Sequence, residues 1–333
     1  MAHTKLVELM AVPADSRDLP WLRESLQAAL ELEFATLPVY LSGMWSIKNQ
    51  SGEVYDLIKS VALEEMLHMG FACNMLTAIG GTPKIVAPTY PGHLPGGVLP
   101  DLKVYLAGLS PATLDMFMAI EEPENPLTPP AEIDYPTIGM FYDAIRALFQ
   151  VLSPPISTNG QLTKTLSVPN PDGSGTQIPE PLTRLASLDD VLKAIATIKD
   201  QGEGTAKSPD SPEFGDELAH YYRFGEIRCG RKFVKVDDHW EYAGDPIPFP
   251  ECYPVAKVPP GGYPDLLASK TFDATFAQLI QKLQDAWSGG GESALEAAIG
   301  LMFQLNVLAA PIVATPLPDG SGNYGPDFIP ATP

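Results

Sequence analysis

The chain has few basic residues and few cysteines. Among its 333 residues, 21 are lysine or arginine and 41 are aspartate or glutamate, which gives a formal net charge of −20. An acidic chain without a basic patch repels polyanions, so we expect no nucleic-acid partner. The three cysteines, Cys73, Cys229 and Cys252, are far apart and show no Cys-x-x-Cys spacing. This pattern is typical of neither a disulfide framework nor a thiolate metal site.

Long apolar runs are also missing. No run of about 18 apolar residues appears. The N-terminal segment MAHTKLVELM lacks a basic region followed by an apolar stretch. We therefore expect no membrane span, no signal peptide and a cytoplasmic location. Because 45% of the residues are hydrophobic, the chain can bury a sizeable core, and a globular protein is expected.

Proline is abundant, with 35 residues, but it gathers outside the segments that have helical periodicity. The sequence thus predicts a helical framework joined by long proline-rich insertions at residues 83–108, 153–186 and 232–263. Short strands are expected within 83–108 and 232–258. One domain over residues 1–333 is favoured, since motifs about 150 residues apart must meet at one site.

Helical periodicity predicts a mainly α protein built on a four-helix bundle. The strongest segments are residues 18–47, 53–79, 111–122 and 213–231. Weaker helices are expected at 137–152, 188–199, 272–287 and 293–313. The third bundle helix comes from either 111–122 or 137–152, within the range 111–152. Asp15 or Ser16 could cap the first helix, and the C-terminal helices of 272–313 are expected to pack outside the bundle.

Ionisable side chains occupy the apolar seams of these segments. Glu33 lies at a seam position of the first segment, and Glu65 and His68 share the seam of the second. The same Glu-x-x-His spacing recurs as Glu217 and His220 in the segment ELAH. A buried carboxylate costs several kcal/mol unless it is paired or binds a metal, and the first two seams contain no lysine or arginine. The sequence therefore predicts a metal centre.

The Glu-x-x-His spacing suits this chemistry because positions i and i+3 lie on one face of a helix. Bundles with di-iron or di-manganese sites use two such pairs and one glutamate from each of the other two helices. Glu121, at the end of 111–122, is the candidate for the remaining glutamate. Glu203, between two glycines after a helical stretch, could substitute for Glu121 or Glu217.

Two stretches, ALELEFATLPVYL and ALEEMLHMGFACNMLTAIGGTP, resemble the ferritin-like domain family. That family includes a domain of the iminophenyl-pyruvate dimer synthases of bisindole pigment and antibiotic pathways. The resemblance continues through MAIEEPE, TIGMFYDAI, IKDQGEGT, ELAHYYRFGEI and DGSGNYGPDF, and so covers residues from about 18 to 328.

The resemblance implies particular roles for several residues. It implies Glu65 and His68 as ligands rather than Glu64. It also implies a tyrosine, Tyr40, seven residues after the ligand Glu33, as in ferritins. Members of the family often carry a glutamate where this chain has Met140, and its loss would weaken or remove one metal ion. Tyr40 is expected to pack in the core or to bond a ligand carboxylate, which is favoured over a radical role.

These observations lead to a functional hypothesis with two alternatives. The leading one is a non-haem oxidoreductase in which one or two iron ions use dioxygen or peroxide on a small organic substrate. Tyr40 would assist the centre, and manganese could replace iron. The resemblance suggests a natural-product substrate derived from an aromatic amino acid. The alternatives are an iron-binding or storage protein and a metal-free scaffold; a homo-oligomer is compatible with each.

Overall fold

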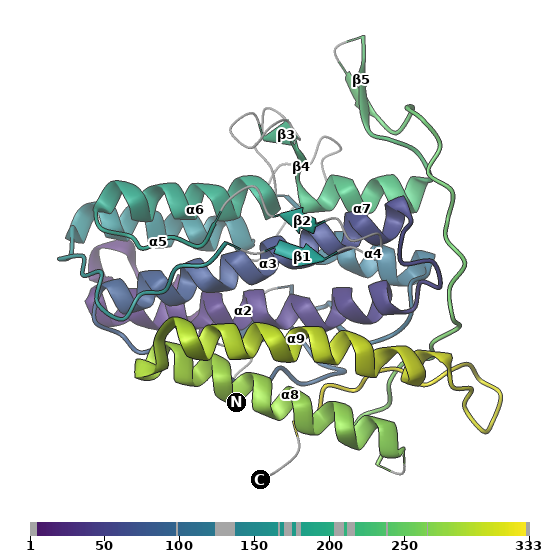
Figure 1. The fold of residues 1–333 in the computed structure, drawn as a ribbon. Helices are drawn as coiled ribbons and strands as arrows, with labels where there is room; N and C mark the ends of the chain where they lie inside the picture. The colour runs from purple at the N-terminus through teal and green to yellow at the C-terminus, as the bar shows by residue number, and fades with distance from the viewer. Residues whose placement is uncertain are drawn as a thin grey trace.

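The computed structural model describes residues 5–97, 99–123, 137–165, 167–169, 175–177, 181–202, 210–211, 217–237, 239–264 and 266–330. Helices dominate it (Figure 1). They are α1 (Lys5–Ala11), α2 (Leu19–Trp45), α3 (Glu53–Ala78), α4 (Pro111–Ile120), α5 (Ile138–Leu152), α6 (Leu188–Gly202), α7 (His220–Cys229), α8 (Leu267–Asp285) and α9 (Gly291–Ala314). The prediction of a mainly helical fold is confirmed.

Two long helices, α2 and α3, pack side by side through the middle of the molecule (Figure 1). Helix α2 begins at Leu19 because the Asp18 carboxylate accepts a hydrogen bond from Trp21 N at 2.9 Å. The expected caps, Asp15 and Ser16, instead lie in a short 3-10 turn before it. Helix α3 ends at Ala78, and Gly80 then takes a positive φ of 76° that favours glycine.

The other two positions of the bundle are each filled by a pair of short helices (Figure 1). Helix α2 contacts both α4 and α5, while α3 contacts both α6 and α7. Across these pairs, α4 packs on α7 and α5 packs on α6. Both candidates for the third helix are therefore used, one for each half of the bundle. Close packing of α4 on α2 depends on Gly43, where a Cβ would lie 2.9 Å from Phe117 Cζ.

The prediction of one helix over residues 213–231 is wrong at its N-terminal end. Helix α7 begins only at His220. Residues Glu217–Leu218 form strand β4, which pairs antiparallel with β3 (Asp210–Ser211). Because the backbone of this segment is extended, the three-residue spacing of Glu217 and His220 does not place them on one helical face.

The remaining strands are short antiparallel pairs. Strand β1 (Ser167–Pro169) pairs with β2 (Gly175–Gln177), and β5 (Val234–Val236) pairs with β6 (His239–Glu241). The pair β5–β6 confirms the strand expected in 232–258. In the described part of 83–108, the pairing is limited to one bridge between Gly92 and Val104.

Helices α8 and α9 form a hairpin on the outer side of α2 (Figure 1). The expected C-terminal helices are thus confirmed, with α8 beginning earlier than predicted, at Leu267. The segment Leu267–Ala314 contains a stretch that is long and apolar enough to cross a membrane by length and composition, although 28% of that stretch is buried. The sequence predicts no such stretch, because α9 has no uninterrupted run of hydrophobic residues of that length. Its alanine, glycine and other weakly polar residues nevertheless keep the mean hydropathy of the helix high.

Candidate metal centre

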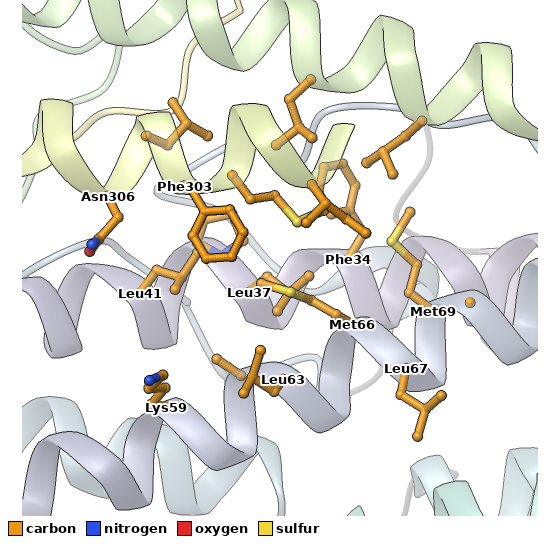
Figure 2. A pocket seen from close by; sticks show the side chains of 18 of the residues that line it. Phe34, Leu37, Leu41, Lys59, Leu63, Met66, Leu67, Met69, Phe303 and Asn306 are labelled. Atoms are coloured by element: carbon orange, nitrogen blue, oxygen red, sulfur yellow. The ribbon is translucent and has the colours of Figure 1, made fainter. Parts of the chain in front are cut away.

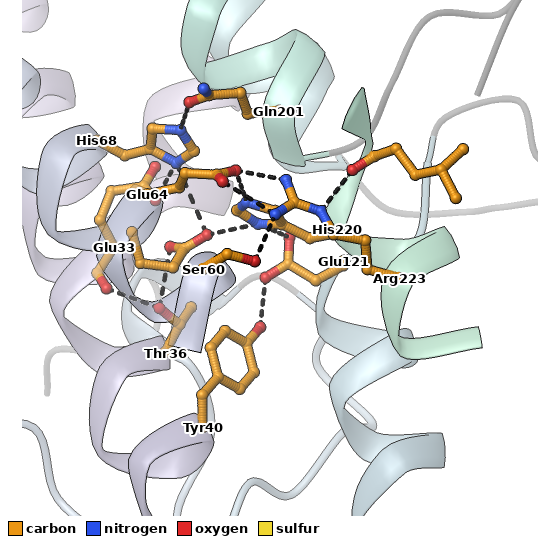
Figure 3. Close-up of polar contacts among 12 residues, drawn as sticks. Glu33, Thr36, Tyr40, Ser60, Glu64, His68, Glu121, Gln201, His220 and Arg223 are labelled. Atoms are coloured by element: carbon orange, nitrogen blue, oxygen red, sulfur yellow. Dashed lines mark hydrogen bonds and ion pairs between the residues drawn. The ribbon is translucent and has the colours of Figure 1, made fainter. Parts of the chain in front are cut away.

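The four short helices meet at a cluster of buried polar side chains (Figure 3). The cluster lies where these helices end or begin, which brings together Glu121 after α4, Tyr142 near the start of α5, Gln201 near the end of α6, and His220 at the start of α7. From the long helices, Glu33 on α2 and Glu65 and His68 on α3 face them. The breaks in the bundle thus place polar groups inside it.

Two groups of ligand-type side chains share Glu65. Glu33, Glu65 and His68 form one group, and Glu65, Glu121 and His220 form the other. Within each group, one nitrogen or oxygen atom of every residue lies within 4.8 Å of the others, and all five residues are buried. A carboxylate shared between two such groups is the arrangement of a bridged pair of metal ions.

Both imidazole rings turn Nδ1 toward the carboxylates of the two ligand groups and Nε2 toward a partner outside those groups. His68 Nε2 lies 2.8 Å from Gln201 Oε1, and its Nδ1 is 3.7 Å from Glu65 Oε1. His220 Nε2 lies 2.9 Å from Glu64 Oε2. His220 Nδ1 is 2.8 Å from Glu65 Oε1, but the alignment is not that of a hydrogen bond, so this buried nitrogen has no hydrogen-bond partner among the described residues. Outer partners that fix the ring in this way are typical of metal-ligating histidines.

Glu64 faces Arg223 rather than the ligand groups. The guanidinium donates to both carboxylate oxygens, with Nη1 2.9 Å from Oε1, and also to Ser60 Oγ at 2.9 Å. Burial would raise the pKa of Glu64, but the attraction of Arg223 and the hydrogen bond with His220 lower this pKa to about 2. Glu64 is therefore an ionised partner for the His220 ring.

Hydroxyl groups hold the carboxylates of the cluster. Tyr40 donates to Glu121 Oε1, and Tyr142 donates to Glu33 Oε1. Thr36 Oγ1 donates to Glu65 Oε2 at 3.0 Å. Burial, followed by repulsion from Glu121, raises the pKa of Tyr40 well above its ordinary value, so this phenol stays protonated and remains a donor.

The charges of the carboxylates show what the cluster needs. Burial and the neighbouring Glu65 raise the pKa of Glu33 well above 4.5, and the same two causes raise the pKa of Glu121. Burial would also raise the pKa of Glu65, but the adjacent imidazoles of His220 and His68 lower it. Burial would lower the pKa of His220, yet the negative charge of Glu121 raises it. The excess of buried negative charge thus raises the pKa of Glu33 and Glu121, and a bound metal ion would compensate that charge.

The donor set fits iron or manganese. Three carboxylates and two imidazole nitrogens are ligands for such ions, and the unpartnered Nδ1 of His220 faces the shared Glu65. The cavity beside the cluster measures about 20 Å³ among the described residues, which is room for about one water molecule. The described residues thus leave space beside the cluster for a small oxidant.

Of the predicted site residues, the structure brings together Glu33, Glu65, His68, Glu121 and His220, and it places Tyr40 against Glu121. Glu203 lies outside the described residues. Glu217 is described only as part of the backbone of β4. Met140 is 47% exposed on α5, away from the cluster.

Sequence reasoning missed the outer partners of the cluster. Tyr142, Gln201 and Arg223 were not predicted, and Glu64 was set aside as a non-ligand without a role. One available signal was Arg223, because it stands three residues after His220 and one helical turn places the two side chains together. Tyr142 and Gln201 come from other helices, and no spacing along the chain relates them to Glu33 or His68.

Comparison with known proteins agrees with this architecture. A family model described as Ferritin-like matches residues 26–229, so the chain belongs to the ferritin-like family. A crystal structure of a ferritin-like protein from Caulobacter vibrioides is 25% identical, with a TM-score of 0.65. That similarity covers 95% of this chain and 99% of the other. No curated protein matches the chain.

Proposed function

We propose that the protein is a non-haem metal oxidoreductase that uses dioxygen or peroxide, and that its two ligand groups, which share Glu65, would hold two iron ions. The observation that carries this proposal is the pair of buried ligand groups sharing one carboxylate, each with an imidazole whose Nδ1 is aimed inward. Manganese would suit the same donors.

Each residue of the cluster has a role in this proposal. Glu33 and His68 would hold one ion, while Glu121 and His220 would hold the other. Iron in a carboxylate-rich pocket supplies redox chemistry with dioxygen or peroxide. Because the pKa values of Glu33 and Glu121 are raised, metal and protons would compete for these carboxylates, and metal affinity would fall at low pH.

The surrounding groups would keep this arrangement fixed. The Tyr40 and Tyr142 hydroxyls would orient Glu121 and Glu33, and Gln201 and Glu64 would hold the two imidazole rings. The burial of Glu33, Glu65 and His220 would keep bulk water from these groups, which strengthens each of these contacts. A small organic substrate, as the family resemblance suggests, remains part of the proposal as its electron donor.

A second candidate function is iron handling without an organic substrate. The cavity of about 20 Å³ beside the cluster favours it, since the space that the described residues enclose there is small enough to suit a metal ion or a small oxidant. In this case ferrous iron would itself be the species oxidised.

The test begins with metal content. Untagged protein purified without added metal is analysed by inductively coupled plasma mass spectrometry, and is then titrated with ferrous iron without oxygen. We expect two ions per chain, one in Glu121→Ala, and none firmly bound in Glu65→Ala. Glu122→Ala, which removes a less buried neighbouring carboxylate, is the matched control and should keep two.

Admission of oxygen then separates the two functions. Oxygen consumption sustained by an organic reductant, in an assembly of a few subunits, supports the oxidoreductase. Oxygen consumption limited by added ferrous iron, with many ions per chain in a very large assembly, supports iron storage. Protein that is reproducibly empty and cannot be loaded overturns both.

A further inference from the structure

A second cavity lies on the opposite side of α2 and α3 from the metal centre, beneath the α8–α9 hairpin. Its volume is about 360 Å³. Along α2 and α3 its walls include Phe34, Leu37, Leu63, Met66 and Met69 (Figure 2). Phe34 and Met66 directly follow Glu33 and Glu65, so each long helix presents a carboxylate to one side and an apolar side chain to the other. A ligand in this cavity would not touch the metal ions.

Two polar groups of this cavity, Lys59 and Asn306, lie toward one end, while Lys164 lies beside Leu182 and Gly70 at the other. Lys59 and Asn306 both lie to the left in Figure 2, on α3 and α9, whereas Leu67 and Met69 lie to the right. The Lys59 side chain is buried, with the residue 6% exposed. Asn306 Oδ1 is buried without a hydrogen-bond partner among the described residues. A buried amide of this kind is costly unless a partner binds it.

The rest of the cavity suits an extended apolar chain. From Lys59 to Gly70, which both line it, α3 rises by about 16 Å. Met66, Met69 and Met302 contribute flexible side chains that adapt to an irregular apolar guest. The volume falls within the range of small-molecule sites. Left empty, an apolar cavity of this size would weaken the fold in proportion to its volume.

The charges of the residues that line the cavity favour a ligand with an anionic polar group. No aspartate or glutamate lines the cavity among the described residues. Lys164, the other lining cation, is paired with Glu296. An ammonium has three N–H donors, so Lys59 can donate to a ligand while it keeps its contacts within the protein. The Asn306 amide can present either its donor or its acceptor.

We propose that this cavity binds a fatty acid. Its carboxylate accepts hydrogen bonds from Lys59 and Asn306, and its acyl chain extends between α3 and α9 toward Met69. Phe303 lines the cavity and is 39% exposed, which places an entrance beside α9. This site is independent of the metal centre and of its proposed activity.

Binding is tested with sodium dodecanoate below its micellar concentration, by calorimetry and by tryptophan fluorescence, because Trp45 and Trp287 both line the cavity. Dodecanol and dodecyltrimethylammonium are compared as probes with a neutral and a positive head. The variants are Lys59→Met, which keeps an apolar stem, and Asn306→Leu. Lys270→Met, which removes an exposed cation from α8, is the matched control.

We expect the wild-type protein to bind one dodecanoate per chain. Lys59→Met should bind it at least about tenfold more weakly, because a hydrogen bond to a charged group contributes roughly this much. Lys270→Met should bind dodecanoate as the wild type does. Asn306→Leu should also weaken dodecanoate, and neither cavity variant should weaken dodecanol. The same affinity in Glu65→Ala is expected, which separates this proposal from the metal centre. The fatty-acid proposal would be overturned if the wild-type protein did not bind dodecanoate. It would also be overturned if dodecanoate, dodecanol and dodecyltrimethylammonium bound with equal affinity. If Lys59→Met does not fold, as judged by circular dichroism, Asn306→Leu decides by the same criteria.

Discussion

Glu64 and Glu65 are neighbours on α3, yet their buried charges are balanced in different ways. Glu64 faces the guanidinium of Arg223, a permanent cation. Glu65 faces the two imidazoles, with His220 Nδ1 at 2.8 Å and His68 Nδ1 at 3.7 Å. Successive residues of a helix are turned by about 100°, which directs the two carboxylates to different partners. Of these two carboxylates, only Glu65 belongs to the candidate ligand groups.

Replacing Glu64 by glutamine should destabilise the protein by about 3–5 kcal/mol, because it leaves the Arg223 charge buried and unpaired. The measurement is urea unfolding of the metal-free protein. The double variant Glu64→Gln, Arg223→Met should regain a large part of the loss, since it removes both partners. An unfolding midpoint in Glu64→Gln equal to that of the wild type would contradict this account.

Each tyrosine of the centre should act on its own metal ion. Tyr40→Phe removes the hydrogen bond to Glu121, and Tyr142→Phe removes the one to Glu33. Loss of such an outer partner typically weakens metal binding about 10–100-fold. Competition titration with ferrous iron should therefore show one weakened ion in each variant and two in the double variant. Equal weakening of both ions by either single change would argue against separate roles.

At the scale of elements, the interrupted helices are the main feature of the fold. An unbroken helix offers the bundle interior a side chain only at every third or fourth position. Here α4, α5, α6 and α7 all end or begin near the same level, so helix-terminal residues such as Glu121 and His220 enter the interior. The candidate metal centre therefore lies at the breaks between these helices.

The packing of α8 on the C-terminal segment should make stability depend on pH. Burial, and then the adjacent Asp327, raises the pKa of Asp273 from 3.8 to about 8. The folded state thus holds this proton more tightly than the unfolded chain does. The stabilisation is complete below pH 4 and is lost as the pH rises to about 8.

Urea unfolding of metal-free protein at pH 5 and pH 9 measures this effect. The wild type should lose stability at the higher pH, and Asp273→Asn should lose less, because it has no proton to release there. Asp101→Asn, which changes an exposed loop carboxylate, should behave like the wild type. Equal pH dependence in Asp273→Asn and the wild type would refute the assignment.

At the scale of the whole molecule, the candidate metal centre joins the consecutive helices α2 and α3 to α4 and to α7, which come much later in the sequence. Metal that binds only the folded state stabilises it, by about 2.7 kcal/mol when free metal is a hundred times the Kd. Ferrous iron or manganese should therefore raise the melting temperature of the wild type by several degrees. A chelator should reverse the rise.

The double variant Glu65→Ala, His68→Ala should show no such rise, because both ligand groups lose a member. Glu122→Ala should retain it. Differential scanning fluorimetry with matched metal concentrations is sufficient. A rise of the same size in the double variant would place the bound metal elsewhere on the chain.

The sequence by itself determined the helical class, the two long helices and five of the clustered side chains. It did so because helical periodicity indicates which face of a helix is buried. A carboxylate or imidazole on such a face costs folding free energy unless it has a partner, so it indicates a site. The ferritin-like resemblance rested on the same stretches and is confirmed at the level of the family. The likeness to iminophenyl-pyruvate dimer synthases stays a prediction.

Only the tertiary structure decided how the bundle is completed and what surrounds the centre. The helix predicted over 213–231 begins at His220 because residues 217–218 pair with 210–211, a contact invisible to helical periodicity. Tyr142 and Gln201 reach the cluster from helices whose spacing along the chain carries no information about Glu33 or His68. Local sequence fixes which face of a helix is buried. Which side chains meet across that face depends on how separate helices pack.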